Sequence, residues 1–315
     1  MRILVLGAGG VGGCFGGRFA ESGADVTFLV RPRRRAQLDE KGLVVHSGFG
    51  DIALPVTTIA SDEITEPYDV VLLSCKAYDL DDAMAAIAPA MGPDSVVLPL
   101  LNGLRQIESL QARFGVANVW GGVCYIGAAF DSNTGEIRHF GDFHRIAFGE
   151  LDGKPSARAD AFAALDQTVE SDIELSADIV QTMWDKFAML CALTTANTIT
   201  GSTIGEILEA PSGEAFLLAA LAENRDSAAA LGHPVSAKTL ELYTRMFTTR
   251  GSPFAASMLR DMQAGRPTEG EHVIGDMVRR AEAQGLETPM LRCALAAIQT
   301  HEAKLKDQTN SPVAA

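Results

Sequence analysis

The first half of the chain alternates short apolar runs with amphipathic stretches. Continuous apolar runs are typical of strands in a parallel sheet, because both faces of such strands are covered. Helical periodicity separates some of these runs, for example in 14–23 and 79–92. The alternation predicts an N-terminal Rossmann-type α/β domain with a doubly wound sheet. The four runs, rich in Val, Leu and Ile, are 2–8, 25–30, 69–75 and 95–101.

Three more strand-like segments follow, and then the pattern changes. Segments 119–130, 136–141 and 145–151 are expected to form a meander that closes the sheet. From Ser176 onward the periodicity is helical and the segments end at glycines, which predicts an all-helical second domain. We therefore expect a dinucleotide-binding domain at 1–175, a helical substrate and catalytic domain at 176–308, and a flexible tail at 309–315. A cleft between two such domains is the default site.

Composition restricts the class of protein. The chain has 315 residues, 47% hydrophobic and 21% charged, as expected of a soluble globular protein with two domains. A net charge of −14 disfavours nucleic acid and anionic membranes as partners. No apolar run approaches the roughly 18 residues of a membrane span. The five cysteines are widely spread and lack metal-ligand spacing, so we expect a cytoplasmic protein without a metal site.

A glycine-rich turn follows the first predicted strand. Gly7, Gly9 and Gly12 form G-x-G-x-x-G, with Gly10 inside the motif. Gly7 would permit a tight turn, Gly9 would let the backbone approach a pyrophosphate, and Gly12 would let the helix pack on the strand. Glycine-rich turns also occur for purely structural reasons. The strand–turn–helix context favours dinucleotide binding.

The residue after the second predicted strand indicates which dinucleotide. Relatives of this fold that bind NAD place an acidic residue here, whereas an arginine suits the extra phosphate of NADP. Arg31 occupies the position, and Arg33 to Arg35 follow it. The alternative is a solvated basic loop. NADP is the cofactor that the sequence predicts.

Two polar positions follow the third and fourth predicted strands. Lys76 comes after 69–75, and Asn102 comes after 95–101. Ligands of this fold bind at the carboxyl ends of the strands, so both are candidate binding residues. Each could also be structural, Lys76 as a surface charge and Asn102 as part of an ordinary Asn-Gly turn.

Lys186 precedes seven consecutive apolar residues, Phe187 to Leu193. A segment apolar on every side is usually buried, so the charge beside it needs a partner or a purpose. One interpretation is a surface pair with Asp185. The other is a proton donor, because hydride delivery to a ketone builds an alkoxide that a nearby acid stabilises.

These motifs together resemble the ketopantoate reductase (2-dehydropantoate 2-reductase) family. The resemblance rests on "GAGGVGG" with Arg31, "CKAYD", "LNG", "WDKF" and "SMLRDMQAGRPTE", in order over nearly the whole chain. Members reduce a 2-oxo acid with NADPH and use a lysine as general acid. The resemblance implies that function here, with the conversion of 2-dehydropantoate to pantoate as the leading reaction.

The resemblance also assigns roles to residues. Lys186 matches the catalytic lysine, and Glu269 matches the acid that contacts the cofactor and orders the active site. Ser257 matches the serine that binds substrate. Lys76 and Asn102 match positions that contact the cofactor near the nicotinamide ribose and the substrate, and Ala128 matches a cofactor-contacting backbone position.

The chain departs from the family pattern at three asparagine positions. Leu190, Thr194 and Ile204 stand where ketopantoate reductases carry asparagines. We expect Thr194 and Asn197 to line a more apolar substrate pocket, since Asn197 lies three residues after Thr194. Substrate identity is what these changes leave open.

Two rival functions remain. One is a paralogous NADPH-dependent reductase of a different 2-oxo acid, and the other is a non-catalytic NADP-sensing protein. The presence of Lys186 and Glu269 argues against the sensor. The expected partner is a small 2-oxo acid, and the apolar stretch "AFLLAALA" is compatible with a homodimer.

Overall fold

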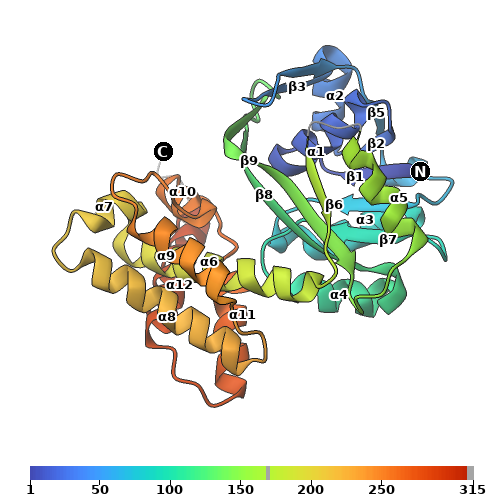
Figure 1. The fold of residues 1–315 in the computed structure, drawn as a ribbon. Coiled ribbons are helices and arrows are strands. Elements are labelled where there is room, and N and C mark those ends of the chain that lie inside the picture. The colour runs from blue at the N-terminus through green and yellow to red at the C-terminus, as the bar shows by residue number, and fades with distance from the viewer. Residues whose placement is uncertain (168–170, 311–315) are drawn as a thin grey trace, which may run out of the picture. The chain divides into compact units, whose positions relative to one another are not determined.

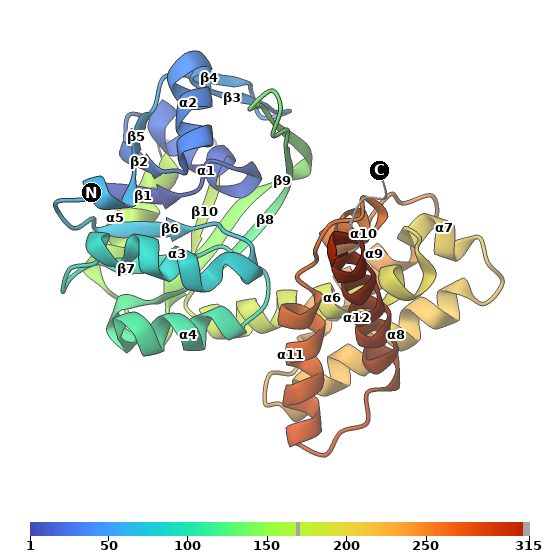
Figure 2. The same cartoon turned by 180° about the vertical axis from the view of Figure 1, so that it is seen from behind.

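The structure is a computed structural model that describes residues 1–167 and 171–310. The chain divides into two compact units (Figures 1 and 2). The first comprises Met1–Asn102 and Gln106–Met183, and the second comprises Gly103–Arg105 and the chain from Trp184 onward. The division falls inside a helix rather than ahead of it at Ser176. Of the tail expected at 309–315, residues 309 and 310 end the last helix, and the others lie outside the described residues.

The first unit contains a five-stranded parallel sheet in the order β5-β2-β1-β6-β7. The strands after β1 are added first on one side of it and then on the other, which is the order of nucleotide-binding sheets. The expected Rossmann-type sheet is therefore confirmed. The four predicted apolar runs become its central strands. The strands are β1 (Arg2–Leu6), β2 (Asp25–Leu29), β5 (Thr57–Ile59), β6 (Val70–Leu73) and β7 (Val96–Pro99).

Both faces of this sheet are covered, which explains why its strands are continuously apolar. On one face Ile3 and Val5 pack in a cluster with Phe15 and Phe19 of α1. On the other face Leu4 packs with residues of α3 and α4 (Figure 2). The helices of this unit are α1 (Gly10–Glu21), α2 (Pro32–Lys41), α3 (Leu80–Ile87), α4 (Arg105–Phe114) and α5 (Ala157–Ala163).

The expected meander does not close the parallel sheet, and that prediction was wrong. The segments form a second sheet, in which the long strands β8 and β9 pair antiparallel and β9 also pairs with β3 and β10. Strand pairing decides this, because β8 pairs with β9 from Trp120 to Phe130, and Trp120, Ile146 and Phe148 pack in the same core cluster as residues of α1. Its strands are β3 (Leu43–His46), β4 (Ile52–Leu54), β8 (Trp120–Phe130), β9 (Ile137–Glu150) and β10 (Asp172–Leu175).

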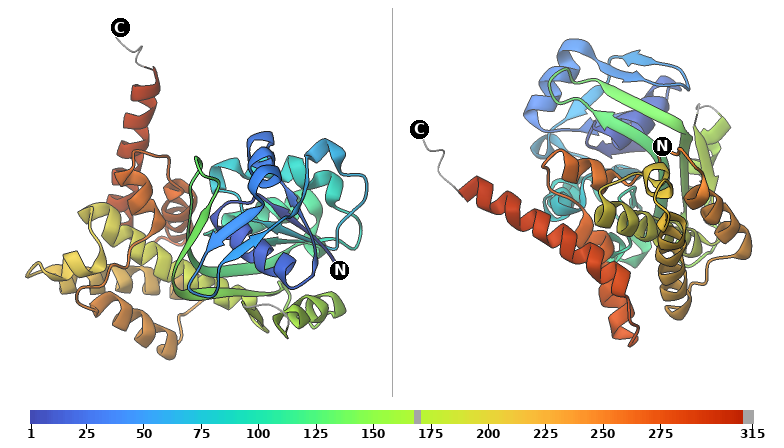
Figure 3. Two further views of the ribbon diagram at one scale, coloured as in Figure 1. Left: turned by 90° about the horizontal axis from the view of Figure 1, so that it is seen from above. Right: turned by 90° about the vertical axis from the view of Figure 1, so that its left-hand side faces the viewer.

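The second unit is helical throughout the part that the structure describes, as expected (Figure 3). Its first long helix, α6, holds the "WDKF" motif. Apolar residues of α8, including Leu217 and Leu221, are buried inside this unit, so the homodimer stays a prediction. The helices are α6 (Ile179–Thr200), α7 (Ile204–Leu208), α8 (Gly213–Ala230), α9 (Ala237–Thr248), α10 (Ser257–Gln263), α11 (Gly270–Ala283) and α12 (Pro289–Asn310).

Candidate functional site

The glycine turn joins β1 to α1, and its glycines have separate geometric roles. Gly7 has a φ of 88°, which suits glycine, and its N–H donates to Leu29 O at 2.9 Å. A Cβ on Gly12 would lie 2.2 Å from Gly7 O and 2.3 Å from Ser74 Oγ, so the helix packs on the strand ends only because Gly12 has none. A Cβ on Gly9 would meet no protein atom within 4 Å. The turn and the close packing are confirmed, and the open side of Gly9 leaves room for a ligand.

Ala128 of β8 lies beside the same turn. A Cβ on Gly10 would stand 3.2 Å from both the Cβ and the carbonyl oxygen of Ala128. The long β8–β9 hairpin therefore brings its backbone to the first turn of α1. This proximity is compatible with the role that the resemblance gives to Ala128.

Arg31 follows β2 and is the residue that precedes α2. Its side chain is 77% exposed, and Nη2 lies 3.5 Å from Asp79 Oδ1. Arg34 differs: Nε donates to Ala8 O at 2.9 Å and Nη1 to Gly135 O at 2.7 Å, and partial burial lowers the pKa of Arg34 to about 10. Arg35 pairs with Glu63. The basic cluster therefore separates into Arg34 and Arg35, which bind other protein groups and are partly buried, and the exposed Arg31 and Arg33.

Lys76 and Asn102 lie beyond the carboxyl ends of neighbouring strands. Lys76 immediately precedes a 3-10 turn, Ala77–Asp79, after β6, and Asn102 follows β7. Because β1, β2, β6 and β7 run parallel, these positions and the glycine turn share one edge of the sheet. The common edge predicted from the sequence is present. Asp79, which the sequence did not single out, lies at the same edge, where its carboxylate is close to the guanidinium of Arg31.

The second unit presents Lys186 in α6. Every residue from Phe187 to Thr198 is buried, whereas Lys186 itself is partly exposed. Trp184 fixes this end of the helix, since its ring stacks on His233 at 4.6 Å between centroids and meets Phe187 edge-on at 5.7 Å. The apolar run thus anchors the helix, and Lys186 stands at the start of the run as a partly exposed residue.

The three positions at which the family pattern has asparagine are buried, two of them in α6 and the third at the start of α7. Leu190 is 8% exposed, and Thr194 and Ile204 are fully buried. In the described structure the hydroxyl of Thr194 has no hydrogen-bond partner. A buried hydroxyl without a partner is costly, so Thr194 is a polar position that a ligand or water could satisfy.

Asn197 is the other residue that we expect to line the pocket. It is fully buried, and its amide is engaged on both sides. Nδ2 donates to Ser202 O at 2.7 Å, and Oδ1 accepts from Ala256 N–H at 2.8 Å. Both ends of the Asn197 amide therefore bind backbone, which helix spacing alone does not reveal, and its place in a substrate pocket stays a prediction.

Ser257 and Glu269 stand at the starts of two helices. Ser257 is the partly exposed first residue of α10, and Glu269, 6% exposed, precedes α11. His272 lies one turn into α11, and a Cβ on Gly103 would stand 2.9 Å from its Cδ2. Burial lowers the pKa of His272, although Glu269 and Asp276 act in the opposite direction. The sequence offered little signal for His272 beyond its place three residues after Glu269.

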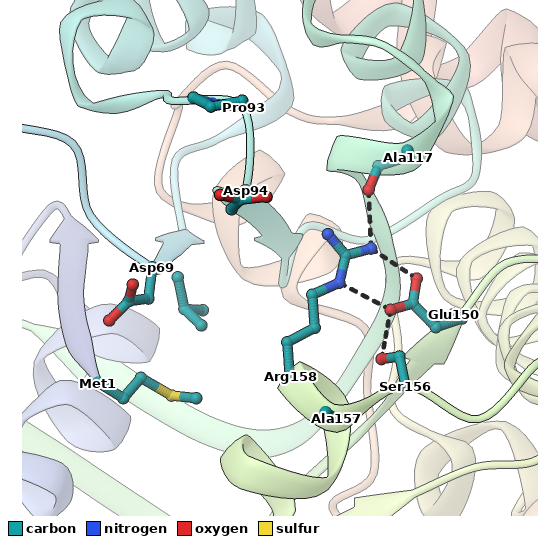
Figure 4. Close-up of a pocket in the computed structure, with 10 residues that line it drawn as sticks. Met1, Asp69, Pro93, Asp94, Ala117, Glu150, Ser156, Ala157 and Arg158 are labelled. Atoms are coloured by element: carbon teal, nitrogen blue, oxygen red, sulfur yellow. Dashed lines mark hydrogen bonds and ion pairs between the residues drawn. The ribbon is translucent and has the colours of Figure 1, made fainter.

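A hollow on the first unit lies near the amino ends of the strands, opposite the glycine turn (Figure 4). Its polar side chains satisfy one another: Arg158 donates to Glu150 at 2.8 Å through both Nε and Nη2, and Ser156 Oγ donates to Glu150 at 2.7 Å. Ligands of this fold bind at the carboxyl ends of strands. The hollow is therefore a structural feature, and Figure 4 shows Arg158 bonded to Glu150 and to the carbonyl of Ala117.

Metal-binding clusters and membrane-spanning helices are two other features that would bear on function. In residues 1–167 and 171–310 no group of three or more His, Cys, Asp or Glu side chains is placed to hold a metal ion. Within the same residues no helix is both long and apolar enough to cross a membrane. All five cysteines are free thiols.

Comparison with known proteins identifies the family. Residues 3–153 match "Ketopantoate reductase PanE/ApbA", and residues 178–302 match "Ketopantoate reductase PanE/ApbA C terminal". The chain is 36% identical to the uncharacterized oxidoreductase YkpB of Bacillus subtilis, over 96% of this chain and 100% of that one.

Solved structures show the same fold. The 2-dehydropantoate 2-reductase of Methylococcus capsulatus superposes with a TM-score of 0.85, at 25% identity and 99% coverage of both chains. A D-mandelate dehydrogenase solved with NADH and anilino(oxo)acetate gives 0.83 at 20% identity, covering 97% of this chain and 100% of that one. The chain therefore belongs to the ketopantoate reductase family of oxidoreductases.

Proposed function

We propose that this protein reduces a small 2-oxo acid to the 2-hydroxy acid with NADPH, and that 2-dehydropantoate is the leading substrate. The observation that carries the proposal is Lys186, a partly exposed residue next to a run of twelve buried residues. A helix anchored in this way holds its lysine in a fixed position, and positioning is what a general acid needs. Family membership supplies the reaction class.

The residues at the carboxyl edge of the parallel sheet fit a dinucleotide. Gly9 leaves its side of the turn open, and Arg31 keeps an exposed guanidinium at the end of β2. That guanidinium suits a ribose phosphate better than a free ribose hydroxyl, which favours NADP over NAD. Lys76 and Asn102 lie at the ends of the next two strands, where they would contact the nicotinamide half.

The chemistry assigned to the chain is proton transfer and orientation. NADPH supplies the hydride. Lys186 would donate its proton to the carbonyl oxygen as the hydride reaches the carbon, and its charge would stabilise the alkoxide that develops. Ser257 would hold the substrate, and Glu269, buried at the start of α11, would order the site.

A second candidate is a 2-oxo acid with a more apolar side chain than ketopantoate. The observation that favours it is the burial of two apolar residues, Leu190 of α6 and Ile204 of α7, at positions that carry asparagine in ketopantoate reductases. Apolar side chains cannot form a hydrogen bond to the hydroxyl group of ketopantoate. A substrate hydroxyl buried against them without a partner would lower the affinity for that substrate.

The experiment is NADPH oxidation across a panel of 2-oxo acids that includes ketopantoate, pyruvate, 2-oxoisovalerate and phenylglyoxylate, with NADH in parallel. Efficient turnover of ketopantoate supports the leading proposal, and higher kcat/KM for an apolar acid supports the second candidate. Binding of NADPH without turnover of any acid would overturn both and leave a non-catalytic sensor.

A further inference from the structure

Asn197 connects the helix that carries Lys186 to the segment that carries Ser257. The Asn197 side chain is fully buried and lies near the carboxyl end of α6. Its Oδ1 accepts from the N–H of Ala256 at 2.8 Å, and Ala256 directly precedes Ser257. Ala256 is itself 3% exposed, so water cannot readily replace this bond.

The rest of this segment is held by other bonds. The N–H of Ile204 donates to Phe254 O at 3.0 Å, and that of Gly205 donates to Ser252 O at 2.9 Å. A Cβ on Gly205 would lie 2.6 Å from the nitrogen of Ser252, so the two backbones are in close contact. Loss of Asn197 would therefore leave the segment attached up to Phe254 and release the residues just before Ser257.

The same helix also sets the position of Lys186. Asn197 lies eleven residues after Lys186 in one continuous α-helix, a separation of roughly 16 Å along the axis. Residues Phe187 to Thr198 are all buried, which restrains the helix between the two. Fixing Ala256 to Asn197 thus fixes the backbone of Ser257 relative to Lys186.

We propose that Asn197 is a positioning residue that sets the place of Ser257 relative to Lys186 without touching substrate or cofactor. The inference rests on the proposed function. It predicts a specific kinetic signature. Substrate binding through Ser257 weakens when Asn197 is lost. NADPH binding stays as it was, because most of its predicted contacts lie in the other unit and the exception, Glu269, lies outside the segment that Asn197 holds.

The test is a double-mutant cycle of Asn197→Ala and Ser257→Ala, measured with the best 2-oxo acid of the panel. A lost buried hydrogen bond corresponds to about a tenfold rise in KM for Asn197→Ala. If Asn197 acts through Ser257, the double variant has nearly the KM of Ser257→Ala alone. Additive effects, or an unchanged KM in Asn197→Ala, would overturn the inference.

Two further variants separate positioning from stability. Asn224 is a matched control, a fully buried asparagine in α8 whose Nδ2 donates to Ala220 O at 3.0 Å. Asn224→Ala should lower the melting temperature and leave KM unchanged. Asn197→Asp loses the donor to Ser202 O but keeps an acceptor for the N–H of Ala256, so it should reverse part of the rise in KM seen in Asn197→Ala. An equal rise in KM for Asn224→Ala would refute the positioning role.

The cycle distinguishes this inference from the proposed function. If the wild-type protein turns over no 2-oxo acid, the proposed function fails. If the wild type is active and Ser257→Ala raises KM while Asn197→Ala does not, only the positioning role fails.

Discussion

Alanine at Gly9 should weaken cofactor binding and leave stability unchanged, whereas alanine at Gly12 should lower the stability of the protein without cofactor. At Gly9 the backbone has φ −87° and ψ −160°, which alanine adopts without strain, and the new Cβ meets no protein atom within 4 Å. Alanine is a poorer N-cap than glycine, which destabilises the protein by about 0.5 kcal/mol. It also lowers the conformational entropy of the unfolded chain, which stabilises the folded protein by about 0.4–1 kcal/mol. The free energy of unfolding without cofactor should therefore barely change.

Cofactor binding should change strongly at Gly9. The methyl would occupy the space through which a pyrophosphate approaches the backbone. Crowding of this kind costs about 1–3 kcal/mol, which corresponds to a rise of about fivefold to 150-fold in the Kd for NADPH. The assay is fluorescence titration of NADPH with Gly9→Ala and the wild type, beside thermal melts of both proteins without cofactor.

Gly12→Ala is the matched comparison. Its Cβ would lie 2.2 Å from the carbonyl oxygen of Gly7, a clash with backbone that requires α1 to move. Overpacking of about 1–3 kcal/mol should lower the melting temperature without cofactor by several degrees. If Gly9→Ala bound NADPH as tightly as the wild type, or melted as early as Gly12→Ala, the division of roles inferred from the turn would be refuted.

Three further predictions concern separate parts of the molecule. Lys186→Ala should lower kcat by about 10²–10⁴-fold with NADPH affinity preserved, and normal turnover would exclude Lys186 as the acid. Asp79→Asn removes the carboxylate 3.5 Å from Arg31 Nη2 and should tighten NADPH by about two- to fivefold without a matching gain for NADH; an unchanged ratio of the two Kd values would contradict this. Burial alone would raise the pKa of Glu150, but hydrogen bonds led by Arg158 lower it overall from 4.5. The group therefore adds stability above about pH 4.5 that is lost as the pH falls through the lowered pKa. Arg158→Ala should move the acid-unfolding midpoint, followed by circular dichroism, to higher pH, and an unmoved midpoint would count against the pairing.

Local sequence patterns were enough to predict much of the fold and the glycine turn of the first unit. The central strands of the parallel sheet are apolar because both faces are covered, so their positions could be predicted from hydrophobicity alone. Gly7 and Gly12 could be recognised from spacing, since a turn with positive φ and a close helix contact both exclude a side chain. The burial of the run after Lys186 followed from its composition.

Other features depended on contacts between distant segments. The segments at 119–151 have the same strand-like pattern whichever sheet they join. Pairing of β8 with β9, together with the packing of Trp120 and Phe148 against Phe162 of α5, places them in a second sheet. Arg31 and Arg34 look alike in sequence, yet Arg34 is held by Ala8 and Gly135 while Arg31 remains exposed.

The sequence by itself determined the alternating α/β architecture, the helical second half, the glycine turn and the helix that carries Lys186, because each depends on local periodicity or on a backbone that only glycine allows. Only the tertiary structure decided which sheet the later strands join, that Arg34 is held by backbone while Arg31 stays exposed, and that Asn197 binds the backbone of Ala256. Those outcomes depend on hydrogen bonds and packing between residues far apart in the chain, which no local pattern encodes.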